Sequence, residues 1–133
     1  IRHYIRHRDE ERPIALGLIS DQSPILRPDM EWIEFFGQPT AFIDGGEKIA
    51  MKFHIPAYFT RIDRVAVGRY AVTFEEVFDG EEQVEEWEIT RRYAERLEAM
   101  IRRRPELWLW SHNRWRHTPE KQAKRFGKST LKE

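Results

Sequence analysis

The spacing of hydrophobic residues changes along the chain, and each change predicts a different element. Residues 14–19 form a continuous apolar run of strand length, which turn-forming residues end at 20–24. A strand that is apolar on both faces is typical of the centre of a parallel sheet. Before it, residues 1–11 place apolar side chains at helical spacing and Pro13 prevents continuation, so this stretch predicts the end of a helix.

Two longer stretches have apolar residues at steps of three and four, the spacing of one helical face. The first predicts a helix from an N-cap at Thr40 to about His54, with Gly46 placed for close packing against a sheet. The second predicts a helix over about 90–104 that packs on the sheet by one face. Residues 20–40, which carry three prolines, instead predict a long loop of the kind that usually serves a site.

Residues 55–62 and 70–74 have the composition of two strands joined by a tight connection at Gly68. The order of strand 14–19, helix and strand 55–62 is a βαβ unit. A right-handed crossover places both strands of such a unit in one sheet, with the helix on its face. The pattern therefore predicts an α/β fold in which flanking helices cover a mixed sheet.

Composition and charge limit the possible functions. With 133 residues, 40% hydrophobic and 35% charged, the chain has the size and character of one globular domain. Its net charge is zero, so no overall field attracts nucleic acid or anionic lipid. Residues 75–88 carry eight acidic and no basic residues, whereas 102–132 is rich in Arg and Lys. We interpret the acidic stretch as a solvated face, because it lacks the glycine-punctuated pattern of an EF-hand loop.

The same features suggest how the chain is organised. We expect residues 1–118 to form the folded unit and residues 119–133 to form a basic tail that is partly disordered. No apolar run reaches the length of a membrane span, and the first residues are too polar for a signal peptide. Because the chain begins without methionine, we expect a fragment of a longer protein. The absence of cysteine excludes disulfides and thiolate metal sites.

Candidate ligand contacts begin with Asp21 and Gln22. They follow directly after the predicted central strand, at the edge where open α/β sheets bind ligands. The alternative is that Asp21 only caps the loop. Among the histidines, only His3 and His7 are closely spaced, and their arginine neighbours repel cations, so we expect no metal site.

Residues 105–116 are the most unusual stretch, with three Trp, two Arg and one His. Trp108 and Trp110 are two positions apart, so in extended backbone they share a face, which we expect to pack against the sheet. Arg114 and Arg116 are candidates for bidentate contacts with a phosphate-bearing ligand. We expect Arg114 to face a cleft or membrane-side phosphates.

Four segments resemble, in order and spacing, the lipid A biosynthesis acyltransferases, also called lauroyl or myristoyl acyltransferases. They are residues 20–24, 35–37, 46–50 and 105–116. The resemblance covers about residues 10–120, and Trp-Leu-Trp-x-His-x-Arg-Trp is its most specific element. The residues of the first and last segments are similar to those of the family branch found in Bacteroides-type bacteria.

This resemblance implies the C-terminal portion of a lysophospholipid/glycerol-phosphate acyltransferase-like fold. It implies an enzyme of lipopolysaccharide biosynthesis that moves a fatty acyl chain from acyl carrier protein to a hydroxyl of a lipid A precursor, without a cofactor. Such enzymes act at the cytoplasmic face of the bacterial inner membrane and carry an N-terminal membrane anchor. Their base is a histidine with an acidic residue five positions later, upstream of the segment that resembles residues 14–19.

No histidine of this chain has an acidic residue five positions later, so we expect no catalytic residue here and no activity from the chain alone. The resemblance implies that the two loops and the Trp-rich block contact substrate, through Asp21, Gln22, Phe35, Phe36, Gly37, His112, Arg114 and Arg116. The rival interpretation is an anionic-ligand or nucleic-acid binding module that uses Trp115, the two arginines and the basic tail. The zero net charge argues against nucleic acid. A third interpretation is a purely structural or partner-binding domain.

Overall fold

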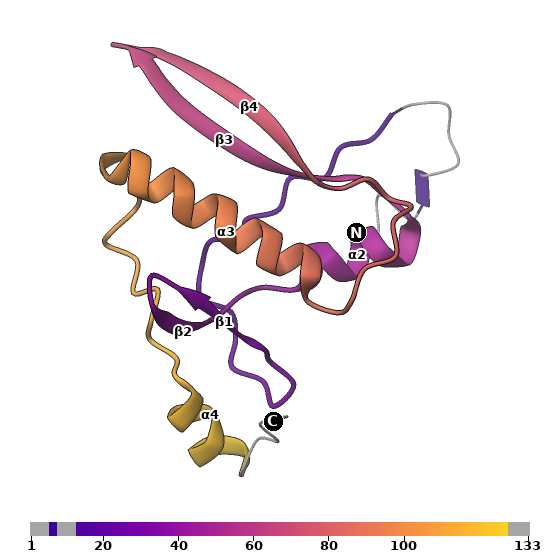
Figure 1. The fold of residues 1–133 in the computed structure, drawn as a ribbon, viewed down its shortest axis with the longest axis vertical. Helices are drawn as coiled ribbons and strands as arrows, with labels where there is room; N and C mark the ends of the chain where they lie inside the picture. Colours follow the sequence, from indigo (N-terminus) through magenta and orange to yellow (C-terminus); the bar gives the residue numbers. More distant parts are fainter. Residues whose placement is uncertain (1–5, 8–12, 128–133) are drawn as a thin grey trace.

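Helix α3 is the longest element, and the others are arranged around it (Figure 1). The computed structural model describes residues 6–7 and 13–127. In chain order the elements are β1 (Trp32–Phe35), β2 (Gln38–Ala41), α2 (Gly45–Phe53), β3 (Ala57–Ala66), β4 (Arg69–Phe78), α3 (Glu88–Arg103), the short 3-10 helix η1 (Pro105–Leu107) and α4 (Pro119–Phe126). Helices and strands thus combine in one chain, which confirms the predicted α/β class.

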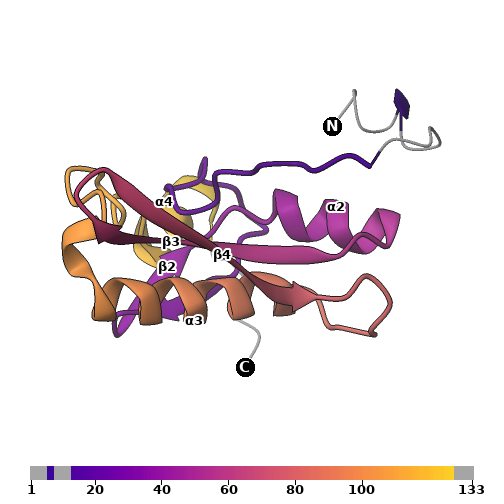
Figure 2. The ribbon, with the colours of Figure 1, turned by 90° about the horizontal axis from the view of Figure 1, so that it is seen from above.

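The core lies on one face of α3, as its spacing predicts. Ala94, Leu97 and Ile101 are buried on this face and belong to the same hydrophobic cluster as Phe42 and Phe59. The hairpin of β3 and β4 lies along the helix (Figure 2). The prediction of a helix over about 90–104 is confirmed.

Strands β3 and β4 form an antiparallel hairpin, which confirms the two predicted strands and the tight connection at Gly68. Gly68 has a positive φ of 69°, a conformation that glycine adopts without strain. One face of the hairpin packs on α3 through Phe59, and on the same face the Arg61 side chain pairs with Glu75 at 2.9 Å. The hairpin is longer than the sequence pattern predicted.

The predicted central strand at residues 14–19 is wrong. These residues form no strand, and the described sheets contain only antiparallel pairs, so no parallel βαβ unit is present in the described part of the chain. Ile19 is 73% exposed. A strand needs a neighbour for its backbone hydrogen bonds, and here the stretch runs past α2 instead. A Cβ added at Gly46 would lie 3.3 Å from Leu18 Cδ1, so the close packing expected at Gly46 occurs against this stretch rather than a sheet.

The loop predicted over residues 20–40 is also wrong at its end, where β1 and β2 form a second antiparallel hairpin. Its two-residue turn has positive φ at both Phe36 (54°) and Gly37 (71°), as a type I′ turn requires. Thr40 lies in β2 and does not cap the following helix. The N-cap position of α2 is occupied by Asp44, while the predicted helix end at His54 is confirmed.

The two ends of the chain are described only in part. Residues 119–126, within the predicted basic tail, form α4, whose buried Gln122 accepts a hydrogen bond from Trp32 Nε1 at 2.8 Å. Arg6 and His7 are helical, and the rest of the helix predicted over residues 1–11 lies outside the described residues. None of the helices in the described ranges is both long and apolar enough to cross a membrane.

Helix α3 is capped by a carboxylate from another helix. The N-cap residue Trp87 has a positive φ of 70° and provides no side-chain cap. Instead the buried Glu47 of α2 accepts hydrogen bonds from the backbone of Trp87, from Thr90 N at 2.8 Å and from Thr90 Oγ1 at 2.6 Å. An anion at a helix N-terminus also interacts favourably with the helix dipole. Glu47 therefore fixes how α2 and α3 meet.

We predict that Glu47→Ala lowers the free energy of unfolding by about 2–4 kcal/mol, because it leaves buried backbone donors without an acceptor. Denaturation of the purified chain, monitored by circular dichroism, measures this change. The control is Glu95→Ala, which removes an exposed carboxylate from α3, the helix that Glu47 caps, and should change stability by less than about 0.5 kcal/mol. Equal effects of the two substitutions would contradict a capping role for Glu47.

Candidate functional site

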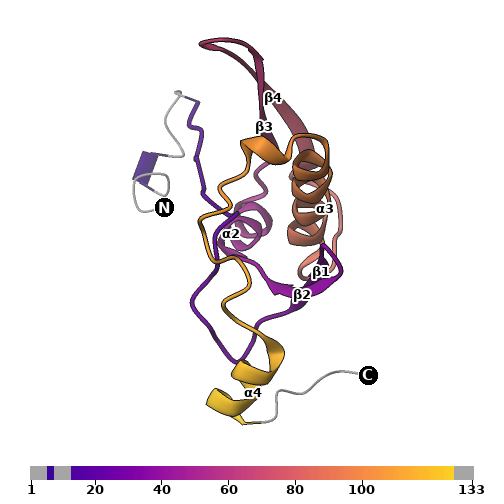
Figure 3. The same cartoon turned by 90° about the vertical axis from the view of Figure 1, so that its left-hand side faces the viewer.

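Ser23 makes most of the hydrogen bonds that hold the loop of residues 20–24 against the Trp-rich block, and the backbone of Pro24 adds one with His117. Ser23 N donates to His112 Nε2 at 3.0 Å, and Ser23 Oγ donates to the carbonyl oxygens of Asn113 and Arg114 at 3.1 and 2.6 Å. The two stretches lie side by side (Figure 3). We call residues 20–24 the strap, because they fasten one segment over the other.

Arg114 lies buried at this junction. The residue is only 3% exposed, and its guanidinium carbon lies 4.3 Å from the centre of the Phe42 ring and 5.8 Å from that of Phe35. None of its three guanidinium nitrogens has a hydrogen-bond partner among the described residues. Buried polar groups in folded proteins almost always have partners, so an unpaired guanidinium needs an explanation.

The electrostatic state of the site follows from this burial. Burial lowers the pKa of Arg114 to about 10, and the nearby Tyr93 and Asp21 only partly oppose this effect. Burial also raises the pKa of Tyr93, and the charge of Asp21 acts in the same direction. Arg114 therefore stays protonated and Tyr93 neutral at neutral pH. Holding a charge whose pKa has fallen this far destabilises the fold by about 3 kcal/mol.

Phe35 and Phe36, predicted to lie in a substrate loop, lie in two different environments. Phe35 is buried, meets Phe42 edge to face at 5.4 Å, and forms part of the aromatic wall around Arg114. Phe36 contacts α3 instead. Its backbone N donates to Glu98 Oε2 at 2.8 Å and its ring lies 4.7 Å from the Arg102 guanidinium carbon. These contacts hold Phe36 in a left-handed conformation that is strained for a residue with a side chain.

The structure gathers three of the eight expected contact residues, Asp21, Phe35 and Arg114, while His112 is bonded to Ser23 of the strap. Phe36 and Gly37 lie at the turn, and Gln22 and Arg116 are exposed. The expectation that Arg114 faces an open cleft is wrong, because its side chain is enclosed. Sequence reasoning missed Tyr93 and Phe42. Tyr93 brings a hydroxyl to the buried face of α3, a signal that was available, whereas Phe42 lies in the apolar stripe of the helix predicted from Thr40 and so indicates only packing.

The tryptophans also differ from expectation. Trp108 packs against the core, but Trp110 is 57% exposed, so the two do not share a buried face. Trp110 N donates to the Trp108 carbonyl at 3.0 Å, which shows that the backbone turns tightly there instead of being extended. Trp115 is half-buried and its Nε1 donates to Thr40 Oγ1 at 2.9 Å. A buried edge of this kind makes Trp115 a poor stacking platform for bases.

The acidic stretch is held by arginines of α3. Arg92 pairs with Glu82 at 2.5 Å and with Glu88 at 3.0 Å, and Asp79 accepts hydrogen bonds from two backbone amides that follow it. Within residues 6–7 and 13–127, no group of three or more histidine and acidic side chains is placed to hold a metal ion. The site consequently offers one buried cation, one nearby carboxylate and aromatic walls, a set suited to recognising an oxyanion.

Comparison with known proteins gives one match. A family model described as bacterial lipid A biosynthesis acyltransferase matches residues 1–117 of the 133. The match includes the strap, the β1–β2 turn and Arg114. No curated protein and no solved structure matches the chain.

We predict that Arg114→Met raises the free energy of unfolding by about 1–2.5 kcal/mol. Removing the unpaired charge removes a destabilisation of about 3 kcal/mol. Losing the contacts with the aromatic rings lowers the free energy of unfolding by about 0.5–2 kcal/mol. Urea denaturation at neutral pH measures the difference. Arg116→Met, at an exposed position, is the matched control and should change stability by less than about 0.5 kcal/mol. A loss of stability from Arg114→Met greater than that of the control would show that the cation stabilises the fold.

Proposed function

The chain belongs to the bacterial lipid A biosynthesis acyltransferase family, and from this premise we propose that it contributes to the transfer of a fatty acyl chain to a hydroxyl of a lipid A precursor. The acyl donor in this proposal is acyl carrier protein, and the product serves lipopolysaccharide assembly. The full-length protein works at the cytoplasmic face of the bacterial inner membrane, and its upstream part contacts the membrane.

The observation that carries the proposal is the unpaired guanidinium of Arg114. An arginine kept in the interior at a cost to stability is expected where its charge has a use in binding or catalysis. Lipid A precursors carry phosphate groups, and guanidinium pairs with phosphate through two parallel hydrogen bonds. A phosphate of the acceptor would provide the partners that Arg114 lacks.

The strap controls access in this proposal. Because the Arg114 nitrogens are enclosed, a ligand reaches them only when residues 20–24 move. Ser23 makes the three hydrogen bonds described above and the backbone of Pro24 bonds His117, so the strap opens when these few contacts break. Asp21, on the same strap, then moves with it and orients the bound acceptor. His112 and Phe35 shape the pocket, while Gln22, Phe36, Gly37 and Arg116 contribute contacts at its rim.

The base that removes the hydroxyl proton lies outside these 133 residues in our proposal. It is a histidine with an acidic residue five positions later, a spacing that no histidine of this chain offers. The base takes the proton as the hydroxyl oxygen attacks the thioester carbonyl, and the thiol of acyl carrier protein departs. The chain described here positions the acceptor for that step.

We predict that the purified 133-residue chain transfers no acyl group, whereas the protein that also carries the His-acid pair does. The assay supplies acyl carrier protein loaded with a labelled acyl chain and follows label in the lipid product. Both proteins are tested at matched concentration with the same acceptor. Transfer by the 133-residue chain would overturn the assignment of the base to another part of the protein.

In the full-length protein, we predict that Arg114→Lys weakens binding of the lipid acceptor by about 1–3 kcal/mol, because lysine cannot form the two parallel bonds. The effect should appear as a higher KM for the acceptor with an unchanged KM for acyl carrier protein. Arg125→Lys, at an exposed position of α4 outside the site, is the control and should leave both nearly unchanged. An acceptor KM that stays at the wild-type value in Arg114→Lys would exclude phosphate recognition by this residue.

A further inference from the structure

The outer face of the β3–β4 hairpin is apolar and uncovered. Its large hydrophobic side chains are all at least half exposed: Tyr58, Ile62, Val65, Val67, Tyr70, Val72 and Phe74. The register places Ile62 opposite Val72 and Thr60 opposite Phe74, so these side chains form one continuous surface. The hairpin's other face packs on α3, and both of its outer edges are unpaired in the described sheets. Contiguous apolar surface of this kind marks a place of interaction.

The tip of the hairpin projects from the body of the molecule. It stands at one extreme of the fold in two perpendicular views (Figures 1 and 3). The register shifts between Arg64 and Ala66, and at this end of the hairpin Val65 is 59% exposed and Val67, in the turn, is 87% exposed. Two valines at the end of a projecting hairpin can enter another phase without any change in the core.

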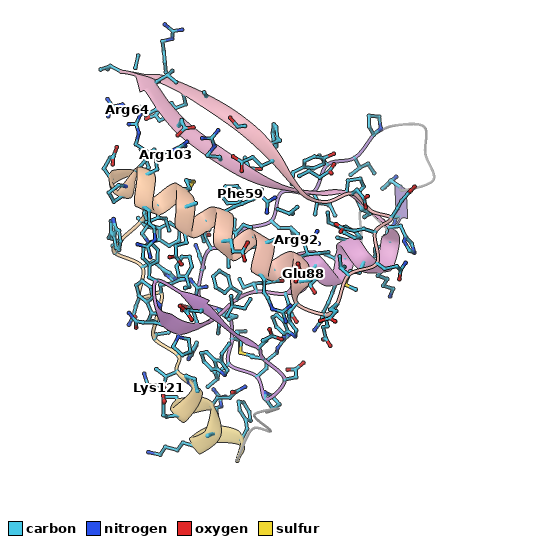
Figure 4. The ribbon with its side chains drawn as sticks, viewed as in Figure 1. Phe59, Arg64, Glu88, Arg92, Arg103 and Lys121 are labelled. Atoms are coloured by element: carbon cyan, nitrogen blue, oxygen red, sulfur yellow. The ribbon has the colours of Figure 1, made fainter. Side chains whose placement is uncertain are left out.

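The charges on the hairpin are divided along its length. Arg64 and Arg69 flank the tip and are exposed, and Arg103 at the end of α3 lies at the same end of the molecule (Figure 4). Arg103 pairs with Asp63 at 2.8 Å, on the face turned towards α3. Glu76, which belongs to the acidic stretch, lies near the opposite end of the hairpin. The apolar tip is thus bordered by positive charge and its base by negative charge.

We propose that the tip of the β3–β4 hairpin inserts into the interfacial region of an anionic lipid bilayer. The valines enter the boundary of the acyl chains, and Tyr70, opposite Arg64 in the register, sits at the level of the headgroups, where tyrosine is enriched. Arg64 and Arg69 contact lipid phosphates, and the acidic base stays away from the negative surface. This contact does not depend on the Arg114 site or on acyl transfer.

The absence of cysteine allows a direct test of insertion. Val67→Cys, labelled with a polarity-sensitive fluorophore, is mixed with vesicles made of equal parts phosphatidylcholine and phosphatidylglycerol. We expect the emission to shift to the blue and increase, with a much smaller response to pure phosphatidylcholine. Leu109→Cys is the matched control, because Leu109 is also an exposed apolar residue, at 62%, but lies outside the hairpin. A response at position 109 equal to that at position 67 would contradict tip insertion.

A second experiment separates the hairpin from α4, which also carries basic side chains. The double variant Arg64→Glu with Arg69→Glu should reduce partitioning onto the anionic vesicles by about tenfold or more, measured by co-sedimentation. The double variant Lys124→Glu with Arg125→Glu should leave it unchanged. All four positions are exposed, so folding is preserved, which circular dichroism checks. The opposite pattern would assign the contact to α4.

The same samples detect two other outcomes, and either overturns the proposal. Absence of binding to the anionic vesicles by the unmodified chain would remove the bilayer as partner. A blue shift of the label at position 67 that appears without vesicles and grows with protein concentration would show that a second copy of the chain covers the tip instead.

Discussion

The contact between the Arg114 guanidinium and the Phe42 ring is the interaction on which the organisation of the site depends. It holds a positive charge in the interior without a hydrogen-bonding partner among the described residues, and Ser23 joins the strap to the backbone of the same segment. An aromatic face partly compensates a cation, but less than water or a carboxylate does. The fold therefore keeps an unsatisfied charge in the segment to which the strap is bonded.

The rest of the structure supports this arrangement by fixing the aromatic walls. Tyr93 projects from α3 and meets Phe42, which directly follows β2, edge to face at 6.3 Å, so α3 helps to shape the enclosure. Glu47 fixes how α3 meets α2 by capping α3. In our proposal, the enclosed arginine binds an anionic group of the lipid A precursor on which enzymes of this family act.

The sequence predicts those elements whose stability is local. Helix α3 has a long apolar stripe and the β3–β4 hairpin has a clear turn, and both are present. The strand expected at residues 14–19 is absent because a strand exists only with a neighbour, which the apolar pattern cannot reveal. The turn at Phe36 was missed because a carboxylate 62 residues away holds its left-handed backbone.

The sequence predicts which residues belong to the site better than it predicts how they are arranged. The pattern brought attention to Asp21, His112 and Arg114, and the structure places the charge of Asp21 near Arg114 and bonds His112 to Ser23 of the strap. The pattern did not indicate that Arg114 is enclosed, since its guanidinium lies against Phe42 and Phe35, more than 70 residues distant along the chain. The burial of an arginine is decided by tertiary contacts, whereas its presence in a Trp-rich block is visible in the sequence.

The most direct test of the account is a structure of the full-length protein with a phosphate-bearing lipid A precursor bound. We expect a phosphate oxygen within about 3 Å of the Arg114 guanidinium, with the strap displaced to admit it. A structure in which a carboxylate of the protein satisfies Arg114 while the precursor's phosphates bind elsewhere would contradict the account.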